Sequence, residues 1–407
     1  MDTLQARQDS VLRHPGYLNF AASRVFSSLS FQCVAIAMGW MIYDQTHSAF
    51  ALALVGLCQF LPMVLLTFVV GHVADRFDRR RIGLACQLIQ AVVSAFLAVG
   101  CWQNWLAPAG ILSAVTILGA TVAFERPTMA ALLPSIMPSS MLQRAIATST
   151  SMMQTALIVG PSLGGLLYGI DPVAPFVVAS VLFAIASINV ISIRMEWTPA
   201  KREPVTLTSI FAGVSFIKSR PVMLGTISLD LFAVLLGGAT ALLPMFARDI
   251  LHAGPWGLGL LRAAPAIGAL AMSIVLARRP LTSKVGAKML SAVAVFGVAT
   301  VVFALSTNIA LSIAALLVVG ASDTVSVVVR SSLVQLLTPD EMRGRVNAVN
   351  SLFIGTSNQL GEFESGMLAG IMGPVAAGVI GGVGTIVVVL LWARLFPDLR
   401  KVKTLQG

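Results

Sequence analysis

Apolar runs of about twenty residues recur from the first quarter of the chain to the last, and they constrain the fold more than any other feature. A helix rises about 1.5 Å per residue, so each run is long enough to cross the hydrocarbon core of a bilayer. A segment in lipid must satisfy its own backbone polar groups, which helices do and open sheets do not. The chain is also 57% hydrophobic, with a mean hydropathy of +0.88. These observations predict an all-α, multi-pass membrane protein.

The hydropathy pattern predicts twelve transmembrane helices. Their expected ranges are 17–44, 50–73, 82–103, 109–130, 143–168, 173–193, 222–247, 255–277, 286–306, 309–331, 345–370 and 374–394.

The distribution of basic residues predicts the orientation of these helices. With the N-terminus in the cytoplasm, every Lys and Arg except Arg24, Arg248 and Arg262 falls at a cytoplasmic end or loop. This agrees with the positive-inside rule and places both termini in the cytoplasm. The net charge of +10 is therefore a topology signal, and nucleic-acid binding is not expected.

An internal repeat and one polar segment predict the domain organisation. A shift of 201 residues superposes Pro138 on Pro339 and Gly160 on Gly361, among six such identities, which indicates two equivalent halves. The polar segment separates six helices from six. The expected parts are an N-terminal cytoplasmic tail at 1–16, a six-helix bundle at 17–193, a cytoplasmic linker at 194–221, a second bundle at 222–396 and a C-terminal tail at 397–407.

A charged turn between the second and third expected helices carries a motif. Its residues are Gly71, Asp75, Arg76, Arg79 and Arg80. In this place they resemble the signature of the major facilitator superfamily. The segments 160–165, 237–250 and 339–353 are similar to its bacterial exporter branch, which includes enterobactin-type siderophore exporters and macrolide efflux pumps.

The resemblance covers essentially the whole chain and implies two pseudo-symmetric six-helix bundles with a site between them. It also implies that Asp75, Arg79 and the helix-4 acid Glu125 form a relay that closes the cytoplasmic side. The full set expected to act as this conformational latch is Gly71, Asp75, Arg76, Arg79, Arg80, Glu125, Arg144 and Arg345. Two departures stand out: Asp78 occupies a position where the family usually has glycine, and 110–124 lacks the coupling arginine of many members.

The run GPSLGG, with Gly160, Pro161, Gly164 and Gly165, resembles a fifth-helix motif associated with antiporters. Small residues also let helices approach closely, so close packing explains the motif equally well.

Ionisable groups within membrane helices are costly and mark functional paths. Expected cavity or proton-coupling residues are Arg24, Gln32, Asp230, Asp323, Asn358 and Glu362. Asp230 and Glu362 are the main coupling candidates, because burial penalises a charged carboxylate and so favours reversible protonation. Arg24 and Asp323 also have structural alternatives. The Arg24 side chain extends to the cytoplasmic lipid headgroups, or Asp323 forms an ion pair with Arg330.

The sequence contains no Walker loop, HExxH motif or nucleophile elbow, so an enzyme, a cofactor and a metal site are not expected. We predict a secondary active transporter of the bacterial cytoplasmic membrane. Its expected role is proton-coupled export of small amphipathic molecules by alternating access. Expected partners are a small-molecule substrate, protons and the lipid bilayer, with the protein a monomer. The alternatives are a lipid or lysophospholipid transporter and a transport-inactive sensor or scaffold.

Overall fold

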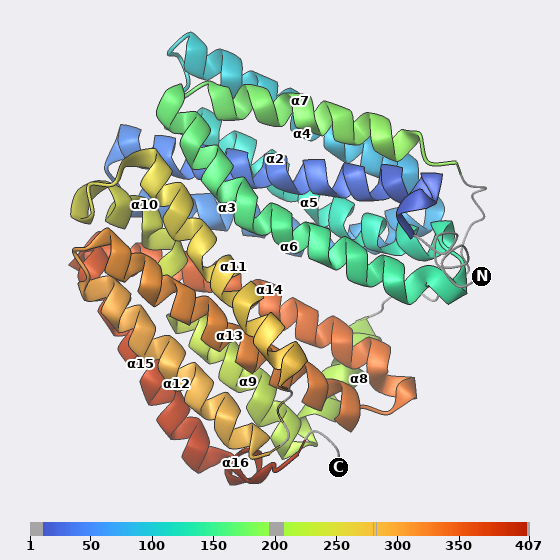
Figure 1. The fold of residues 1–407 in the computed structure, drawn as a ribbon, viewed down its shortest axis with the longest axis vertical. Coiled ribbons are helices and arrows are strands. Elements are labelled where there is room, and N and C mark those ends of the chain that lie inside the picture. Colours follow the sequence, from blue (N-terminus) through green and yellow to red (C-terminus); the bar gives the residue numbers. More distant parts are fainter. Residues whose placement is uncertain (1–10, 195–206, 280, 282, 405–407) are drawn as a thin grey trace. The chain divides into compact units, whose positions relative to one another are not determined.

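The computed structural model describes residues 11–194, 207–279, 281 and 283–404, and these residues form helices joined by short turns (Figure 1). No β-strand occurs among them. This confirms the all-helical prediction. The tail at 1–10 and most of the predicted linker, 195–206, lie outside the described residues.

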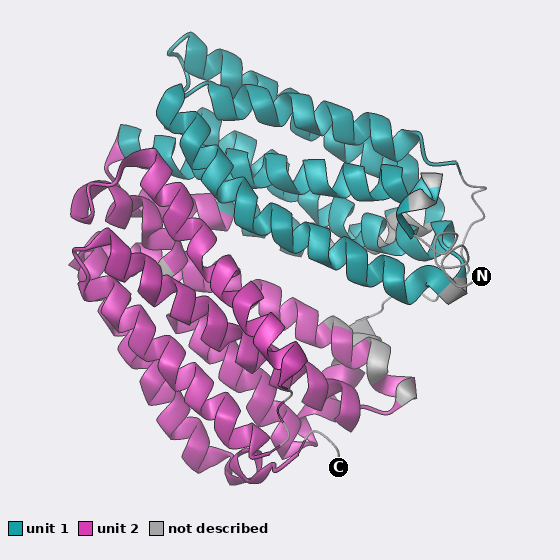
Figure 2. Cartoon of the chain, in the orientation of Figure 1, with its two compact units in different colours: residues 1–45, 58–204 teal, residues 46–57, 205–407 magenta. Residues whose placement is uncertain are grey.

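The chain divides into two compact units, drawn in separate colours in Figure 2. Unit 1 comprises residues 1–45 and 58–204, and unit 2 comprises residues 46–57 and 205–407. The beginning of one helix, α3, therefore groups with unit 2. The tail, bundle and linker boundaries drawn from the sequence stay a prediction.

Unit 1 is built from a 3₁₀ turn and six long helices, the second of which, α3, it shares with unit 2. They are η1 (Val11–Arg13), α2 (Pro15–Thr46), α3 (Ala49–Arg76), α4 (Arg79–Trp102), α5 (Pro108–Ile136), α6 (Ser139–Ile170) and α7 (Ala174–Ile191).

In its described part, unit 2 contains five long helices, one helix that is broken into pieces, and two shorter helices, α8 and α16. They are α8 (Leu207–Lys218), α9 (Pro221–Leu236), η2 (Ala239–Leu242), α10 (Leu243–Met245), η3 (Phe246–Ile250), α11 (Gly254–Arg278), α12 (Val285–Leu305), α13 (Ile309–Leu337), α14 (Asp340–Met372), α15 (Pro374–Leu395) and α16 (Pro397–Lys401).

Eleven stretches of the described chain are long and apolar enough to cross a membrane. They match eleven of the twelve predicted spans. The remaining one, 345–370, lies within the 33-residue helix α14, whose recurring polar and charged side chains lower its hydropathy. The sequence therefore predicted the helix, but α14 is not apolar enough to count as a candidate span.

One predicted span is interrupted. The range 222–247 was expected to be continuous, but α9 ends at Leu236 and the chain passes through Gly237 and Gly238 into a 3₁₀ turn. A short α-helical turn and a π-helical turn, Phe246–Ile250, follow. Two consecutive glycines favour such a break because glycine loses more backbone conformational freedom in a helix than any other residue.

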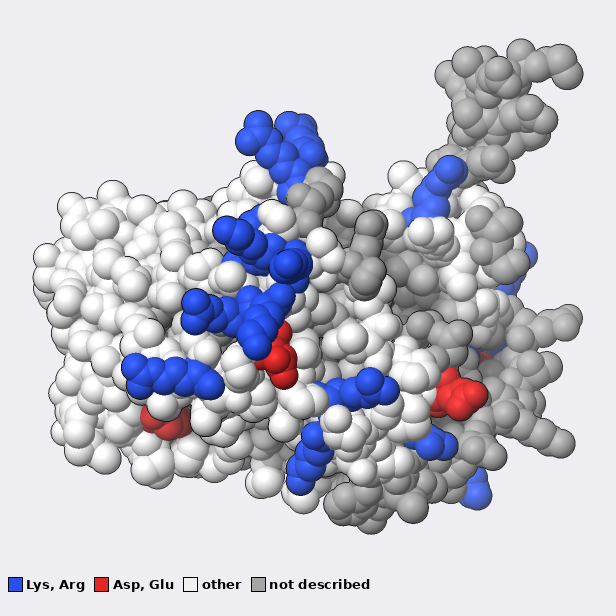
Figure 3. All heavy atoms as spheres, turned by 90° about the horizontal axis from the view of Figure 1, so that it is seen from below, with Lys and Arg blue, Asp and Glu red and all other residues white. Residues whose placement is uncertain are grey.

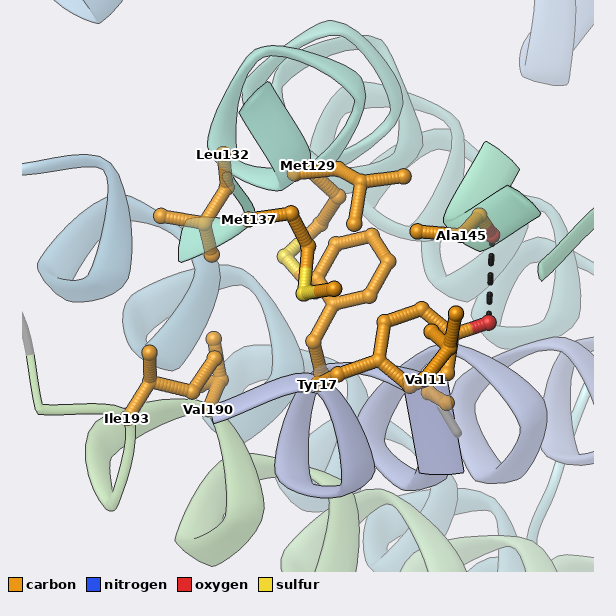
Figure 4. Close-up of a cluster of buried hydrophobic side chains, with 11 residues drawn as sticks. Val11, Tyr17, Met129, Leu132, Met137, Ala145, Val190 and Ile193 are labelled. Atoms are coloured by element: carbon orange, nitrogen blue, oxygen red, sulfur yellow. Dashed lines mark hydrogen bonds between the residues drawn. The ribbon is translucent and has the colours of Figure 1, made fainter. Parts of the chain in front are cut away.

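The core of unit 1 forms where η1, α2, α5, α6 and the end of α7 meet (Figure 4). Tyr17 and Phe20 are fully buried there. The Tyr17 hydroxyl donates to the Ala145 carbonyl at 3.1 Å, which satisfies the one polar atom of this ring.

Small residues bring α11 and α13 together in unit 2. A side chain at Gly320 would collide with the Pro265 carbonyl oxygen, and one at Gly268 would collide with that of Leu317. In lipid there is no hydrophobic driving force between helices, so close backbone packing of this kind holds α11 and α13 together.

Basic side chains gather at the end of unit 2 where α11 ends, α12 begins and α16 lies. Arg278, Arg279, Lys284, Arg400 and Lys401 are all exposed there. Figure 3 shows Lys and Arg clustered on part of the surface beside a broad stretch without charged side chains.

We predict that Gly320→Ala destabilises unit 2 by about 1–3 kcal/mol, since the added methyl group forces α11 and α13 apart. Thermal unfolding of the purified protein in detergent measures the change. Gly169→Ala is the matched control, because nothing lies within 4 Å of a methyl group at this helical glycine. Equal melting temperatures for the two variants would contradict the packing role of Gly320.

Candidate functional site

A cavity of about 180 Å³ lies inside unit 2, beside the break after α9. Gly237, Gly238 and Thr240 line it from the break, and Phe296 and Phe303 line it from α12. Its carboxyl and amide groups come from α13 and α14. They are the side chains of Asp323, Asn358 and Glu362.

Close backbone packing positions Glu362. A side chain at the preceding residue, Gly361, would meet the carbonyl oxygens of Val234 and Leu235 at 2.8 and 2.7 Å, so α14 lies directly against the end of α9. On the other side, a Cβ atom at Gly56 would lie 3.7 Å from Glu362 Oε2. The carboxyl group of Glu362 is thus held between α3 and the cavity.

Asp323 and Glu362 have no hydrogen-bond or ion-pair partner among the described residues. The nearby charges act on them at longer range: Arg330 and Asp230 on Asp323, and Arg262 on Glu362. Two carboxyl groups therefore face a small cavity without a direct counter-ion.

Asp230 is paired. Arg330 Nη1 lies 3.0 Å from Asp230 Oδ2, and both side chains are at most 6% exposed. The expected alternative, an Asp323–Arg330 pair, is wrong, because Arg330 is seven residues beyond Asp323 on α13 and reaches across to α9 instead.

A second, smaller space of about 10 Å³ joins these two acids, and it is lined by Asp230, Ser322, Asp323 and Ser326. This is roughly the room that one water molecule needs. Ser326 Oγ is buried there without a partner among the described residues. Asp323 lines both spaces, so Asp230, Asp323 and Glu362 form a row of acids along the two.

Unit 1 holds a different polar cluster around Glu125 of α5. Glu125 Oε1 accepts from Ser27 Oγ at 2.7 Å and from Gln87 Nε2 at 2.9 Å, and Oε2 accepts from Gln90 Nε2 at 2.8 Å. Ser23 in turn bonds the Gln87 side chain at 2.9 Å.

The expected Arg79–Glu125 bridge is absent from this arrangement. Arg79 Nη1 donates to the Ala131 carbonyl at 3.0 Å and to Ser135 Oγ at 3.2 Å. Ser135 lies ten residues beyond Glu125 on α5, about 15 Å along the axis, so the guanidinium is too far from this carboxylate.

The charged turn before α4 caps helix ends. Asp78 is the N-cap of α4 and accepts from the Arg80 backbone N–H at 2.9 Å. The Arg80 guanidinium contacts the Asp78 carboxylate at 2.7 Å and donates to the Ile193 carbonyl, just beyond α7, at 2.8 Å. Cations at helix C-termini are favoured by the helix dipole, so Arg79 and Arg80 stabilise the ends of α5 and α7.

Other predicted residues lie elsewhere in unit 1. Arg24 is half-buried, with its guanidinium 5.7 Å from the centre of the Phe20 ring. Gln32 packs against Gly160, where a Cβ atom would lie 2.6 Å from that of Gln32. Gly164 likewise lies against the Cys33 backbone, so this motif brings α6 close to α2.

The latch residues are described only in part. Gly71 and Asp75 lie on α3, but their side chains are outside the described residues. Arg76, Arg144 and Arg345 are exposed. Arg345 Nη1 lies 3.7 Å from Met342 Sδ.

The polar cluster of Ser23, Ser27, Gln87 and Gln90 around Glu125 was not predicted from the sequence. Its signal was available: Gln87 and Gln90 are three residues apart in an otherwise apolar helix, and Ser23 and Ser27 are four apart on another. Such spacings place polar groups on one helix face. No group of three or more His, Cys, Asp or Glu residues that could hold a metal occurs in the described part of the chain.

Comparison with known proteins decides the family. The sequence profile of the transmembrane secretion effector family matches residues 10–406. The chain belongs to this family, which is part of the major facilitator superfamily. The protein is a membrane transporter of the bacterial inner membrane with several membrane passes, and transporters of this type are not enzymes.

Curated relatives of this transporter include two enterobactin exporters. That of Citrobacter koseri is 25% identical over 397 residues, covering 95% of this chain and 93% of the relative. That of Shigella boydii is 24% identical over 396 residues, with the same coverage.

Solved structures share the fold of the transporter. A bacterial homologue of the human lysosomal transporter Spinster, inward-facing and occupied, has a TM-score of 0.73 at 14% identity, covering 94% of this chain and 96% of that one. A bacterial homologue of the iron transporter ferroportin has a TM-score of 0.69 at 16% identity, covering 97% and 100%.

We predict that Arg330→Met alone destabilises the transporter by about 3–5 kcal/mol, because it leaves Asp230 buried and unpaired. Combining it with Asp230→Leu should recover most of the loss, since no isolated charge then remains. Thermal unfolding in detergent measures both variants. A double variant no more stable than the single one would show that the ion pair is not the reason.

Asp78 gives a pH-dependent prediction. Burial raises the pKa of Asp78, but the Arg80 side-chain and backbone hydrogen bonds and the Arg80 and Arg81 charges outweigh it, so the pKa lies below its ordinary 3.8. A carboxyl group whose pKa is lower in the folded protein stabilises the fold at any pH above its pKa in the unfolded protein. That stabilisation is lost as the pH falls through its pKa in the folded protein. At neutral pH, Asp78→Ala should lower the free energy of unfolding by about 0.5–2 kcal/mol. The difference between the two proteins should vanish once the pH lies below the pKa of Asp78 in the folded protein. A pH-independent difference in melting temperature would argue against the cap.

Proposed function

We propose that the protein is a proton-driven exporter of small amphipathic molecules that works by alternating access. The observation that carries this proposal is the unit 2 cavity, where Asp323 and Glu362 face open space without a direct counter-ion. Burial penalises the charged form of a carboxyl group, so such groups are suited to binding and releasing a proton.

The size of the cavity favours protons over cargo. About 180 Å³ is smaller than the roughly 300–1,000 Å³ of drug-sized ligand pockets. Water and protons fit there, and a cargo molecule does not. We therefore assign the row of Asp230, Asp323 and Glu362 to coupling. The free carboxyls, Asp323 and Glu362, load the proton, while Asp230 is held by Arg330.

An apolar groove in unit 1 supports amphipathic cargo. It encloses about 380 Å³ and is lined along α2 and α6, among others by Leu18, Val25 and Val159. Arg24 lies on the same helix and presents donors suited to anionic or carbonyl-rich groups. The names of the relatives, enterobactin exporters, support outward transport and make enterobactin the first probe.

We also propose that α14 is the twelfth span and that both termini are cytoplasmic. The polar stripe of α14 then faces protein or water and not lipid, which explains its low hydropathy. The basic end of unit 2 agrees with this orientation under the positive-inside rule. The transporter is proposed to act as a monomer.

The charged turn after α3 is proposed to act as a latch in which Gly71, Asp75 and Arg76 take part. In this structure the Arg79 and Arg80 side chains donate hydrogen bonds to carbonyl groups at the ends of α5 and α7. A few kcal/mol in such contacts is enough to redistribute two transport states.

We predict that Glu362→Gln abolishes enterobactin-driven proton flux in reconstituted vesicles, because the amide cannot carry a proton. A pH-sensitive dye inside the vesicles measures the flux. Glu364→Gln is the matched control: Glu364 lies two residues away, accepts from Ser365 Oγ at 3.4 Å and does not line the cavity. It should keep wild-type flux.

Asp323→Asn completes this experiment. If Asp323→Asn loses proton flux and Glu362→Gln keeps it, Asp323 of α13 carries the proton, and the cavity is still the coupling site. Normal coupled flux in both cavity variants would contradict the proposal.

A further inference from the structure

Two short segments at one end of unit 2 carry eight cations and a single acid, Asp398. The segments are residues 275–288, from the end of α11 to the start of α12, and residues 391–404, from the end of α15 through α16. We call their cations the basic patch: Arg278, Arg279, Lys284, Lys288, Arg394, Arg400, Lys401 and Lys403. All are exposed except the half-buried Lys288. The Asp398 carboxylate lies 3.8 Å from Lys401 Nζ and so offsets only one of these charges.

The backbone of the second segment is docked on the start of α12. The N–H groups of Val285 and Gly286 donate to the carbonyl oxygens of Lys403 and Val402, at 3.4 and 3.2 Å. Leu399 is fully buried in the same apolar cluster as Val285. These contacts bring the cations of the two segments together. They also satisfy the N–H groups at the start of α12, so the helix end is not itself a free binding site.

This docking has an electrostatic cost that membrane topology does not require. The positive-inside rule needs cations at cytoplasmic helix ends, but it does not need them next to one another. Like charges within about 8 Å repel one another at physiological salt, and cations are disfavoured at the N-terminus of a helix such as α12. A partner that carries negative charge offsets both costs.

Apolar side chains beside the basic patch indicate the chemistry of this partner. Ile274 and Val275 on α11 are exposed, as are Leu391 and Leu395 on α15. They lie within about one helical turn of patch cations on the same helices, and in a membrane transporter such side chains face acyl chains. In Figure 3, Lys and Arg likewise border a broad surface without charged side chains. The basic patch therefore begins where the lipid-facing surface ends, which is the level of the phospholipid phosphates.

We propose that the basic patch binds the headgroups of anionic phospholipids. Their negatively charged phosphates lie among the cations, while their acyl chains cover the neighbouring apolar side chains of α11 and α15. The docked segment completes the site, because it supplies Arg400, Lys401 and Lys403. This lipid site is separate from the cavity proposed for proton coupling.

Binding of a fluorescent phosphatidylglycerol to the purified full-length protein in detergent tests the proposal. Arg400→Gln combined with Lys403→Gln should weaken binding about 25-fold, at roughly fivefold for each cation removed. Raising the salt concentration should weaken binding to the wild-type protein as well. The matched control combines Arg81→Gln with Lys218→Gln. It removes two exposed cations at other helix ends and should keep the wild-type affinity.

Gly286→Ala tests the docking without removing any charge. A methyl group at this position would collide with the Leu399 carbonyl oxygen, so the docked segment should move away and phosphatidylglycerol should bind more weakly. Arg400→Lys combined with Lys403→Arg keeps both charges and should keep the affinity. This variant separates loss of charge from any general effect of substitution at the two positions.

Several outcomes would overturn the proposal. Equal affinity for phosphatidylglycerol and phosphatidylcholine would show that headgroup charge is not recognised, and equal losses in the patch variant and its control would show that the patch is not the site. Full displacement of the lipid by inorganic phosphate would make free phosphate the ligand. Unchanged affinity in Gly286→Ala would contradict the role of the docked segment. Proton flux and cargo are absent from these measurements, so their failure leaves the coupling proposed for Glu362 standing, and the reverse also holds.

Discussion

The cost of placing charge among apolar helices is the constraint on which this structure depends. The protein meets it in three ways. Asp230 is neutralised by Arg330, Glu125 is solvated by Ser27, Gln87 and Gln90, and Asp323 and Glu362 face a cavity. The ion pair fixes α9 to α13, the donors from α2 and α4 hold Glu125 of α5, and the cavity leaves Asp323 and Glu362 without a direct counter-ion. The proposed coupling is therefore placed on acids other than the one that the ion pair holds.

Backbone packing decides where these acids lie. The glycines at the end of α9 allow the helix to break and let Gly361 of α14 come against it, which brings Glu362 to the cavity wall. At the charged turn, Asp78 starts α4 while Arg79 and Arg80 close the ends of α5 and α7. The concentration of charge in that turn therefore has a local structural cause in addition to its proposed roles in topology and gating.

The sequence predicted eleven of the helices well because their length and hydropathy are those of a membrane span. It also predicted α14, whose polar side chains lower its hydropathy. It failed where side-chain partners depend on the relative rotation of helices. Helical spacing placed Asp323 and Arg330 on one face of α13, but only the packed structure shows that Arg330 reaches Asp230. Likewise, no spacing rule connects Gln87 and Gln90 to Glu125, because the contact crosses from α4 to α5. The sequence shows two glycines at 237–238, where the helix breaks. The residues around them form a continuous apolar run, which predicts an unbroken span.

Wild-type transport under an imposed pH gradient tests the central claim most directly. Proteoliposomes with an acidic interior and no membrane voltage would be given external enterobactin, with and without a protonophore. The account predicts that cargo accumulates inside only while the gradient lasts, and that the interior becomes more alkaline as cargo enters. Equal cargo uptake with and without the gradient, with no accompanying proton movement, would contradict it.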